Sequence, residues 1–403
     1  MTTQVLVGRQ PIFNQKLDVV AYELLYRDAN NEDSAEFHDA DQATTEVIIN
    51  TFLEIGLQNI TGQLPAYINL TRSYLLGEKT LPIQKDQIVL EVLENVEIDS
   101  QLVDSLRELS KQGYTIALDD YLYQEHHDEL IKIADIIKID VLSLSQDDIK
   151  HQVDILKKHD VTLLAEKIET QDIFEFCKSS GFDLYQGFFL SKPKTISGQQ
   201  ISTNRLPILR LMSMLYDENV EISDLENIIN QDVSLSYRLL RYINSSFYGL
   251  RIKIESVNHA LVLLGIIKIR HWISLICLTR IEDKPSYIIT TALVRSRMCE
   301  LLAEASGDRN SNSYFTVGLF SSLDALLDMT MEKILATMPL SEAIVQALLN
   351  GDGIMGAALN CTLQYERGNW EAVSFCELDI STIKDCYLQS IKWARDVMQE
   401  LQI

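Results

Sequence analysis

The sequence predicts two fold classes in one chain, α/β followed by all-α, with a TIM-like (β/α) barrel first and a helical bundle second. Short apolar runs that end in a polar residue recur roughly every 20 to 28 residues between Asn69 and Gln186. That interval is about the length of one strand-loop-helix unit of a parallel barrel. After Arg205 the strand signature disappears, and apolar residues take helical spacing.

A chain of 403 residues with 46% hydrophobic content is long enough for at least two cores. Pro, Ser, Gly and Gln replace the apolar pattern between residues 191 and 200, which is typical of a linker. We therefore predict a barrel domain at 1–196, a linker at 197–204 and a helical domain at 205–403.

The barrel strands are predicted by β-branched or apolar runs, each of which ends in a carboxylate, carboxamide or amine. The runs lie at 20–23, 66–69, 88–91, 116–120, 136–138, 163–166 and 184–186. Amphipathic stretches such as 101–112 separate them, so the first half has parallel α/β character. Working residues of such a barrel lie at the carboxyl ends of its strands.

The helical half is predicted from apolar residues that recur every three or four positions. The first segment places them at Leu206, Leu209, Met212 and Leu215, and the next at Leu235, Leu239, Tyr242 and Ile243. This spacing is typical of helices that pack in a bundle. His259 and His271 fall on apolar helical stretches, so we expect them to be packed or hydrogen-bonded and not to bind a metal.

Charge and cysteine spacing exclude several classes of function. The formal charge of −23 repels phosphate backbones, so general nucleic-acid binding is not expected, although one small anion held by metals is compatible with it. The six cysteines show no Cys-x-x-Cys spacing, which argues against a zinc site or a disulfide framework.

No basic and apolar leader follows Met1, and charged residues interrupt the most apolar later stretch, 260–278. We therefore expect neither a signal peptide nor a membrane span, and a cytoplasmic protein.

The polar residues at the strand ends match the chemistry of phosphodiester cleavage. Two divalent cations about 3.5 to 4 Å apart supply a nucleophilic water and neutralise the attacked phosphate. Such hard cations prefer carboxylate and amide oxygens. The side chains of this kind are Glu23, Asn69, Glu91, Asp119, Asp120 and Glu166. Taken singly, each is compatible with a helix cap or an ion pair, but their joint order with Lys138 and Gln186 indicates a site.

These residues lie in motifs that resemble the EAL domains, which hydrolyse cyclic di-GMP. The matching stretches are 10–13 (QPIF), 23–27 (ELLYR, with Leu24 for the usual Ala), 68–70 (INL), 90–94 (LEVLE), 118–120 (LDD), 137–140 (IKID), 165–169 (AEKIE) and 186–193 (QGFFLSKP). The resemblance covers residues 6 to about 194. It implies an EAL-type barrel in which an early strand runs antiparallel to the rest.

The resemblance also implies roles for individual residues. The six oxygen donors named above would hold two Mg²⁺ or Mn²⁺ ions, with Glu166 also counted among the catalytic residues. Lys138 would orient or activate the attacking water and Gln186 would support the site. Arg27, Gln10 and Pro193 would bind substrate, and Glu94 would brace the loop after the fourth strand. The product of cyclic di-GMP would be linear pGpG.

Two departures from the family pattern bear on activity. The family usually has a Phe-Gly turn and a glycine-rich loop after the Asp pair, whereas 121–128 (YLYQEHHD) contains no glycine. Its usual glycine after the Ala-Glu pair is Lys167 here, a cation beside an expected ligand. The altered loop is also the part that would mediate a homodimer, which the family makes plausible. The adjacent His126 and His127 are expected to be solvated.

The second half resembles the HDOD domain, a helical relative of HD phosphohydrolases that lacks their metal site. The matching stretches are 232–245, 260–265 and 315–324. Where a working HD enzyme carries its His-Asp pair, this chain has Ser321 and Ser322, so we expect no hydrolysis by this half. The family implies that it contacts protein partners.

Two functions follow from the EAL–HDOD order. In the first, the barrel is a cyclic di-GMP phosphodiesterase, and the helical half relays the signal by protein contacts. In the second, the altered loop and Lys167 have removed catalysis, and the barrel is a regulator that binds cyclic di-GMP or protein partners. A third possibility is a purely structural barrel that binds neither metal nor nucleotide.

Overall fold

The computed structural model describes most of the chain in nine stretches: 5–28, 55–78, 84–121, 128–191, 206–217, 219–244, 253–279, 281 and 284–401. The chain divides into two compact units, one of 1–190 with 364–372 and one of 191–363 with 373–403. The predicted linker, 197–204, lies outside the described residues, so the domain boundaries remain predictions.

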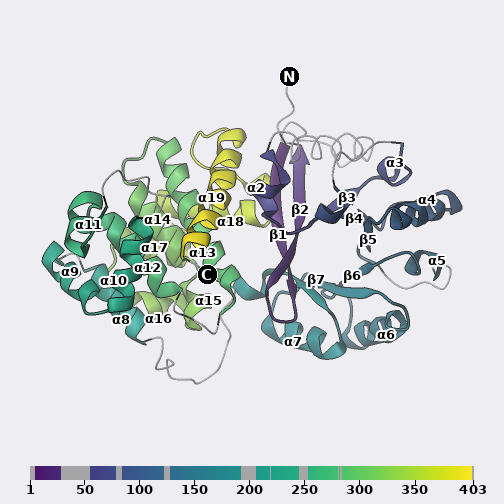
Figure 1. Ribbon diagram of the computed structural model, residues 1–403, viewed down its shortest axis with the longest axis horizontal. Coiled ribbons are helices and arrows are strands. Elements are labelled where there is room, and N and C mark those ends of the chain that lie inside the picture. The colour runs from purple at the N-terminus through teal and green to yellow at the C-terminus, as the bar shows by residue number, and fades with distance from the viewer. Residues whose placement is uncertain are drawn as a thin grey trace. The chain divides into compact units, whose positions relative to one another are not determined.

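The first unit is a closed barrel of eight strands in sequence order (Figure 1). The strands are β1 (Val5–Asn14), β2 (Val19–Asp28), β3 (Ala66–Leu70), β4 (Ile88–Val92), β5 (Thr115–Leu118), β6 (Ile136–Asp140), β7 (Thr162–Glu166) and β8 (Leu184–Gln186). β1 pairs antiparallel with both β2 and β8, and every other neighbouring pair is parallel. The expected TIM-like EAL barrel with one early antiparallel strand is therefore confirmed.

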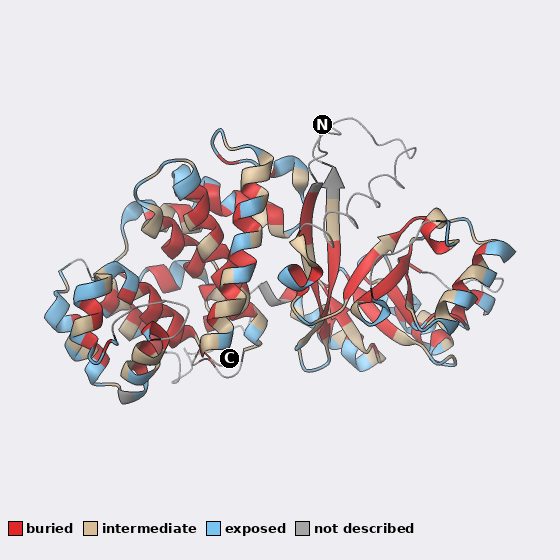
Figure 2. Ribbon diagram, turned by 45° about the horizontal axis from the view of Figure 1, so that its top comes forward, coloured by how far each residue is buried: buried red, intermediate tan, exposed pale blue. Residues whose placement is uncertain are grey.

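The interior of the barrel is filled by apolar side chains. The buried cluster consists of Ile12, Ala21, Tyr67, Val89, Ala117, Ile136 and Leu164. Seven strands contribute one residue each, so the interior is a packed core and not a pore. Buried residues follow the barrel strands, as Figure 2 shows.

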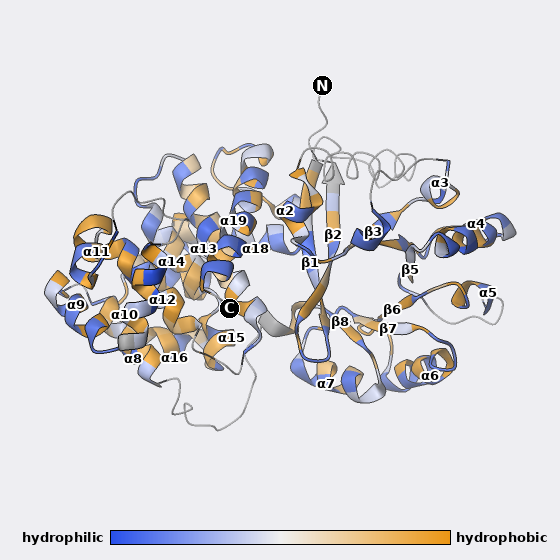
Figure 3. Ribbon diagram, viewed as in Figure 1, coloured by the Kyte–Doolittle hydropathy of each residue, from blue (hydrophilic) through white to orange (hydrophobic). Residues whose placement is uncertain are grey.

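The three longest helices of the barrel unit begin at capping residues. They are α2 (Leu57–Thr61), α3 (Arg72–Leu75), α4 (Ser100–Lys111), α5 (Asp128–Ile131), α6 (Gln146–Leu156) and α7 (Gln171–Ser180), with 3-10 turns at Lys85–Gln87 and Phe188–Ser191. The side chains of Asp99, Ser145 and Thr170 cap α4, α6 and α7 by accepting backbone N–H groups. Hydrophobic and hydrophilic residues alternate around α4 and α6 (Figure 3), because one face of each helix packs inward.

The second unit is helical, as predicted. It contains α8 (Leu206–Leu215), α9 (Ile222–Asn230), α10 (Val233–Ile243), α11 (Val257–Leu264), α12 (Ile266–Leu278), α13 (Ser286–Ala305), α14 (Ser311–Phe320), α15 (Leu323–Leu327), α16 (Met331–Leu335), α17 (Glu342–Asn350), most of α18 (Gly353–Glu366) and α19 (Ile380–Leu401). The 3-10 turn Trp370–Ala372, which follows α18, belongs to the first unit.

The core of this unit is built on α12 and α13, whose residues are buried on most sides. The backbone of α14 approaches α13 closely at Gly318, where an added Cβ would lie 2.4 Å from the Arg295 carbonyl oxygen. Only glycine fits that crossing without a shift of one helix.

The structure also bears on the expectations for cysteines and membrane spans. All six cysteines are free thiols, five buried and Cys376 exposed. Among the described residues, no helix combines the length and apolar character needed to cross a bilayer.

Candidate functional site

The carboxyl ends of the barrel strands bring the predicted polar residues to one rim. The parallel register pairs Asn69 of β3 with Glu91 of β4, and it pairs Asp140 of β6 with Glu166 of β7. Glu23 of β2 joins this rim although its partner strand β1 runs the other way. Neighbouring strands therefore present oxygen atoms side by side.

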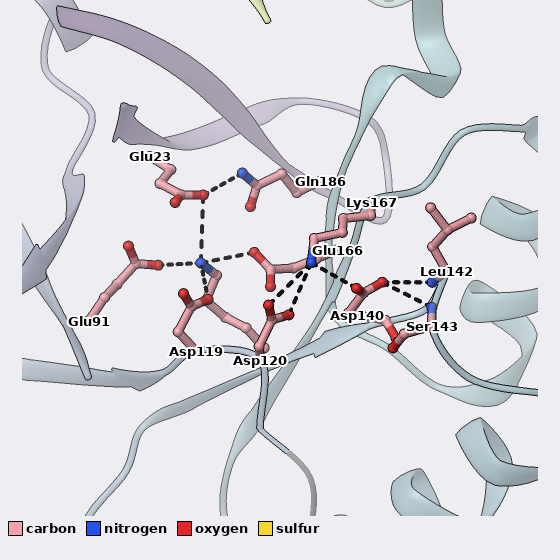
Figure 4. A network of polar contacts seen from close by, with 11 residues as sticks. Glu23, Glu91, Asp119, Asp120, Asp140, Leu142, Ser143, Glu166, Lys167 and Gln186 are labelled. Carbon is pink, nitrogen blue, oxygen red and sulfur yellow. Dashed lines mark hydrogen bonds and ion pairs between the residues drawn. The ribbon is translucent and has the colours of Figure 1, made fainter. Parts of the chain in front are cut away.

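The ammonium group of Lys138 is surrounded by carboxylates. Its Nζ atom lies 2.6 Å from Glu91, 2.7 Å from Asp119, 2.9 Å from Glu166 and 3.6 Å from Glu23. The Lys138 side chain is only 1% exposed. Figure 4 shows the four acidic side chains pointing toward one another. Four predicted ligands therefore share one buried cation.

Burial and mutual repulsion shift the pKa values of these groups. Burial, with repulsion from Glu23 and Asp119, raises the pKa of Glu91 well above its usual range, although Lys138 opposes the shift. The same causes raise the pKa of Glu166 to about 8. Burial lowers the pKa of Lys138, but attraction to the surrounding carboxylates outweighs it and the net shift is upward. Near neutral pH Lys138 is therefore protonated, and Glu91 and Glu166 keep part of their protons.

Several oxygen atoms at the rim have no hydrogen-bond donor among the described residues. They are Asn69 Oδ1, both Glu91 carboxylate oxygens and Gln186 Oε1, all buried. The Glu91 Oε1 atom is close to Lys138, but its contact lacks hydrogen-bond geometry. Unsatisfied buried oxygens are costly, and carboxylate and amide oxygens are the donors that hard cations prefer. The donor set fits Mg²⁺ or Mn²⁺.

The positions of these oxygen atoms are set by the Lys138 ammonium. In the part of the chain that the structure describes, no three acidic, His or Cys side chains form a group already spaced for a metal ion. The carboxylates are spread around the Lys138 ammonium instead. A divalent cation that binds there has to replace some of the ion pairs between Lys138 and the carboxylates.

A second lysine pairs with the remaining carboxylate of the Asp pair. The Lys167 Nζ atom lies 3.2 Å from Asp120 and 2.7 Å from Asp140. Partial burial lowers the pKa of Lys167, but hydrogen bonds with Asp140 and Asp120 outweigh it and raise the pKa. Asp140 is also held by its own loop, because its Oδ1 atom accepts the backbone N–H groups of Leu142 and Ser143.

Two of these residues adopt backbone conformations that favour glycine. Asp120 has φ +43° and Lys167 has φ +57°. Aspartate tolerates the left-handed region better than lysine does. The backbone of Lys167 is therefore strained, while its side chain makes two ion pairs.

The remaining predicted residues lie as follows. Gln186 donates from its Nε2 atom to Glu23 over 2.6 Å, within the buried rim. Glu94 is exposed in the turn after β4, and Gln10 lies on β1 opposite Glu23. Arg27 is on β2, but its side chain lies outside the described residues. Pro193 and the His126–His127 pair also lie outside them.

Sequence reasoning missed Asp140 as a member of the rim. A signal was present, because residues two apart on a strand share a face, and Asp140 stands two positions after Lys138. In the helical unit, Ser321 donates to the Gly318 carbonyl, and Ser322 Oγ lies 3.3 Å from a buried Arg295 nitrogen. The expected packing of His271 is also found, since it is buried and stacks on Phe315.

Comparisons with known proteins agree with this architecture. Residues 10–193 match the EAL domain family model, and residues 206–342 match the HDOD domain family model. The uncharacterised protein YuxH of Bacillus subtilis (strain 168) is 35% identical over 406 aligned positions, which cover 98% of this chain and 99% of YuxH.

A second relative has an assigned activity. The cyclic di-GMP phosphodiesterase CdgJ of Vibrio cholerae serotype O1 is 31% identical over 399 positions, which cover 97% of this chain and 92% of CdgJ. Among solved structures, the PaMucR phosphodiesterase in complex with c-di-GMP is 20% identical with a TM-score of 0.39, covering 47% of this chain and 97% of that one.

Proposed function

Because the chain belongs to the family of proteins in which an EAL domain precedes an HDOD domain, we propose that it is a cyclic di-GMP phosphodiesterase. Its barrel hydrolyses cyclic di-GMP to linear pGpG with Mg²⁺ or Mn²⁺. The observation that carries the proposal is the convergence of Glu23, Glu91, Asp119 and Glu166 around one point at the barrel rim. The activity in the name of CdgJ supports the same reaction.

The reaction needs an attacking water and a place for phosphate charge. A water oxygen attacks phosphorus and the P–O bond to one ribose 3′ oxygen breaks. The leaving 3′ oxygen takes up a proton and becomes a hydroxyl, and a 5′-phosphate remains on the linear product. The carboxylates, with Asn69 and Asp120, would hold divalent metal, whose chemistry would be to acidify the water and to offset the phosphate charge.

Lys138 holds its neighbouring carboxylates in place and orients the attacking water. Gln186 fixes Glu23 by its 2.6 Å hydrogen bond. Arg27, Gln10 and Pro193 contact the substrate, and Glu94 braces the loop after β4.

The helical unit acts through protein contacts in this proposal. Val262, Leu263 and Ile267 are 70%, 51% and 44% exposed near the junction of α11 and α12. Exposed apolar side chains of this size are common at protein interfaces. A homodimer of the barrels and a cytoplasmic location remain predictions.

A second candidate is a regulator that binds cyclic di-GMP without cleaving it. The observation that favours it is the pairing of Lys167 with Asp120, because a bound cation must compete with that ammonium. The two candidates differ in whether pGpG forms.

The test is turnover of cyclic di-GMP by purified protein with Mn²⁺, with products resolved by chromatography. We expect pGpG from the unaltered chain and a loss of at least about 100-fold in Glu23→Gln, which removes a carboxylate from the metal site. Glu108→Gln is the matched control, because Glu108 is 60% exposed on α4. Nucleotide binding without product would establish the regulator, and equal turnover in Glu23→Gln would refute the site assignment.

A further inference from the structure

The acidic residues at the rim fall into two groups, each with its own ammonium. Lys138 contacts four carboxylates, which leaves three formal negative charges in that group when all are ionised. Lys167 contacts two, Asp120 and Asp140, which leaves one. Four carboxyl groups face the first ammonium and two face the second, so the first group offers a divalent cation more oxygen ligands.

Asp120 is the carboxylate whose use as a ligand separates a two-cation site from a one-cation site. Among the described residues, it is the only predicted carboxylate ligand without an ion pair to Lys138. Two cations about 3.5 to 4 Å apart share ligands and spread over neighbouring carboxylates. A second cation would therefore need Asp120, where the Lys167 ammonium now lies.

Lys167 is held in this place from its far side as well. Asp140 Oδ2 lies 2.7 Å from the Lys167 ammonium, while Asp140 Oδ1 accepts backbone N–H groups of its own loop. The anchor fixes the carboxylate that orients Lys167, so the lysine is positioned by the fold and not only by Asp120. Figure 4 shows the Lys167 side chain reaching between these two acids.

We propose that the Lys167 ammonium takes the place of the second divalent cation beside Asp120, so that the barrel binds one divalent cation per chain. The inference rests on the proposed function and deepens it by fixing the metal stoichiometry. The Lys167 side chain is 49% exposed, and its two ion pairs hold the ammonium beside the site. This ammonium supplies one positive charge there, but it does not acidify a bound water as a metal does.

The experiment counts bound Mn²⁺ per chain by electron paramagnetic resonance of the free ion, with full-length protein and no nucleotide. The unaltered chain is expected to bind one Mn²⁺. Lys167→Met keeps most of the length of the side chain and the strain at φ +57° while it removes the charge, so it should bind two. Lys167→Arg keeps the charge and should bind one.

Lys167→Gly shows whether the variants report charge or backbone strain, because glycine adopts this conformation freely. It should also bind two Mn²⁺. Leu17→Gly is its matched control, because Leu17 has φ +66° in the turn between β1 and β2. Gln15 of this turn donates to the Phe182 carbonyl, which precedes β8, so the turn lies at the end of the barrel opposite the rim. Leu17→Gly should bind one, like the unaltered chain.

Each outcome decides the inference. One Mn²⁺ in the unaltered chain and two in both Lys167→Met and Lys167→Gly support it. Two in the unaltered chain overturn the inference alone, and turnover that depends on Glu23 would leave the proposed function standing. One in Lys167→Met or in Lys167→Gly shows that the ammonium is not what excludes the second cation. None in the unaltered chain overturns both the inference and the metal-dependent function.

Discussion

The buried lysine of the barrel is held in place by charge. Lys138 is 1% exposed and touches four carboxylates. Removal of one partner from a buried ion pair leaves the other charge uncompensated, which costs about 3–5 kcal/mol. Without a bound metal, Lys138 therefore stabilises the fold by neutralising part of the buried carboxylate charge.

Lys138→Met should therefore lower the free energy of unfolding by about 3–5 kcal/mol at pH 8 with a chelator present. Urea denaturation measures it. Lys111→Met is the control, because Lys111 is 68% exposed on α4, and it should change stability by less than about 0.5 kcal/mol. If both variants lost the same small amount, the buried cluster would not depend on its ammonium.

His271 gives the helical unit a dependence on pH. Its ring stacks on Phe315 at 4.2 Å, and Thr316 Oγ1 lies 3.4 Å from its Nε2 atom. Burial, with repulsion from Arg270, lowers the pKa of His271 to about 3. Between about pH 6.5 and pH 3 the unfolded chain therefore binds a proton that the folded chain does not.

The unfolding free energy of the helical unit should fall as the pH drops below about 6.5, by about 1.4 kcal/mol per unit from this group. Between pH 6.5 and 5 the fall is about 2 kcal/mol. Urea denaturation followed by tryptophan fluorescence measures it, because Trp272 and Trp393 belong to the helical unit. His271→Gln should remove most of this slope, whereas His259→Gln, at a half-buried position on α11, should keep more of it. A slope unchanged in His271→Gln would contradict the assignment.

At the level of elements, the segments after β7 and β8 hold each other in place. Ile168 N–H donates to the Gln186 carbonyl, and Phe189 N–H donates to the Ile168 carbonyl. Gly187 has φ +149°, and an added Cβ would lie 2.1 Å from the Ile168 carbonyl oxygen. These contacts fix Lys167 and Gln186 relative to each other.

Gly187→Ala should lower the unfolding free energy by about 3 kcal/mol, since both backbone strain and overpacking oppose the new methyl group. Gly77→Ala is the matched control, because Gly77 has φ +75° but open space around its Cα atom, so only strain of about 1–2 kcal/mol applies. Urea denaturation of both variants separates the two costs. Equal losses of unfolding free energy would mean that the backbone at Ile168 shifts without cost to make room for the methyl group.

The elements were largely predictable from the sequence, and the contacts between side chains were not. Strand ends are marked by the change from apolar to polar residues, so the convergence at one rim follows once the strands are parallel. The sequence placed Lys138 at the same site as the acids, but not in direct ion pairs with four of them, because those contacts depend on side-chain reach across the barrel. The pairing of Lys167 with Asp140 was missed for the same reason.

At the scale of the whole molecule, the two predicted fold classes are both present, and the formal charge of −23 acts on every ligand. A dinucleotide with two phosphates is repelled by this field, whereas divalent cations are attracted. A bound cation therefore favours substrate binding in two ways: it contacts the phosphate directly, and it reduces the overall negative field that repels the substrate.

The pairing of β1 with β8 also sets an order in time. Ile12 is hydrogen-bonded to a strand whose last residue is Gln186, so the barrel cannot close until that residue has left the ribosome. At ~5–20 residues per second, the β1–β2 hairpin waits roughly 8 to 30 s with one edge open. During synthesis this edge is the place where a chaperone, or another unfinished chain, meets the protein first.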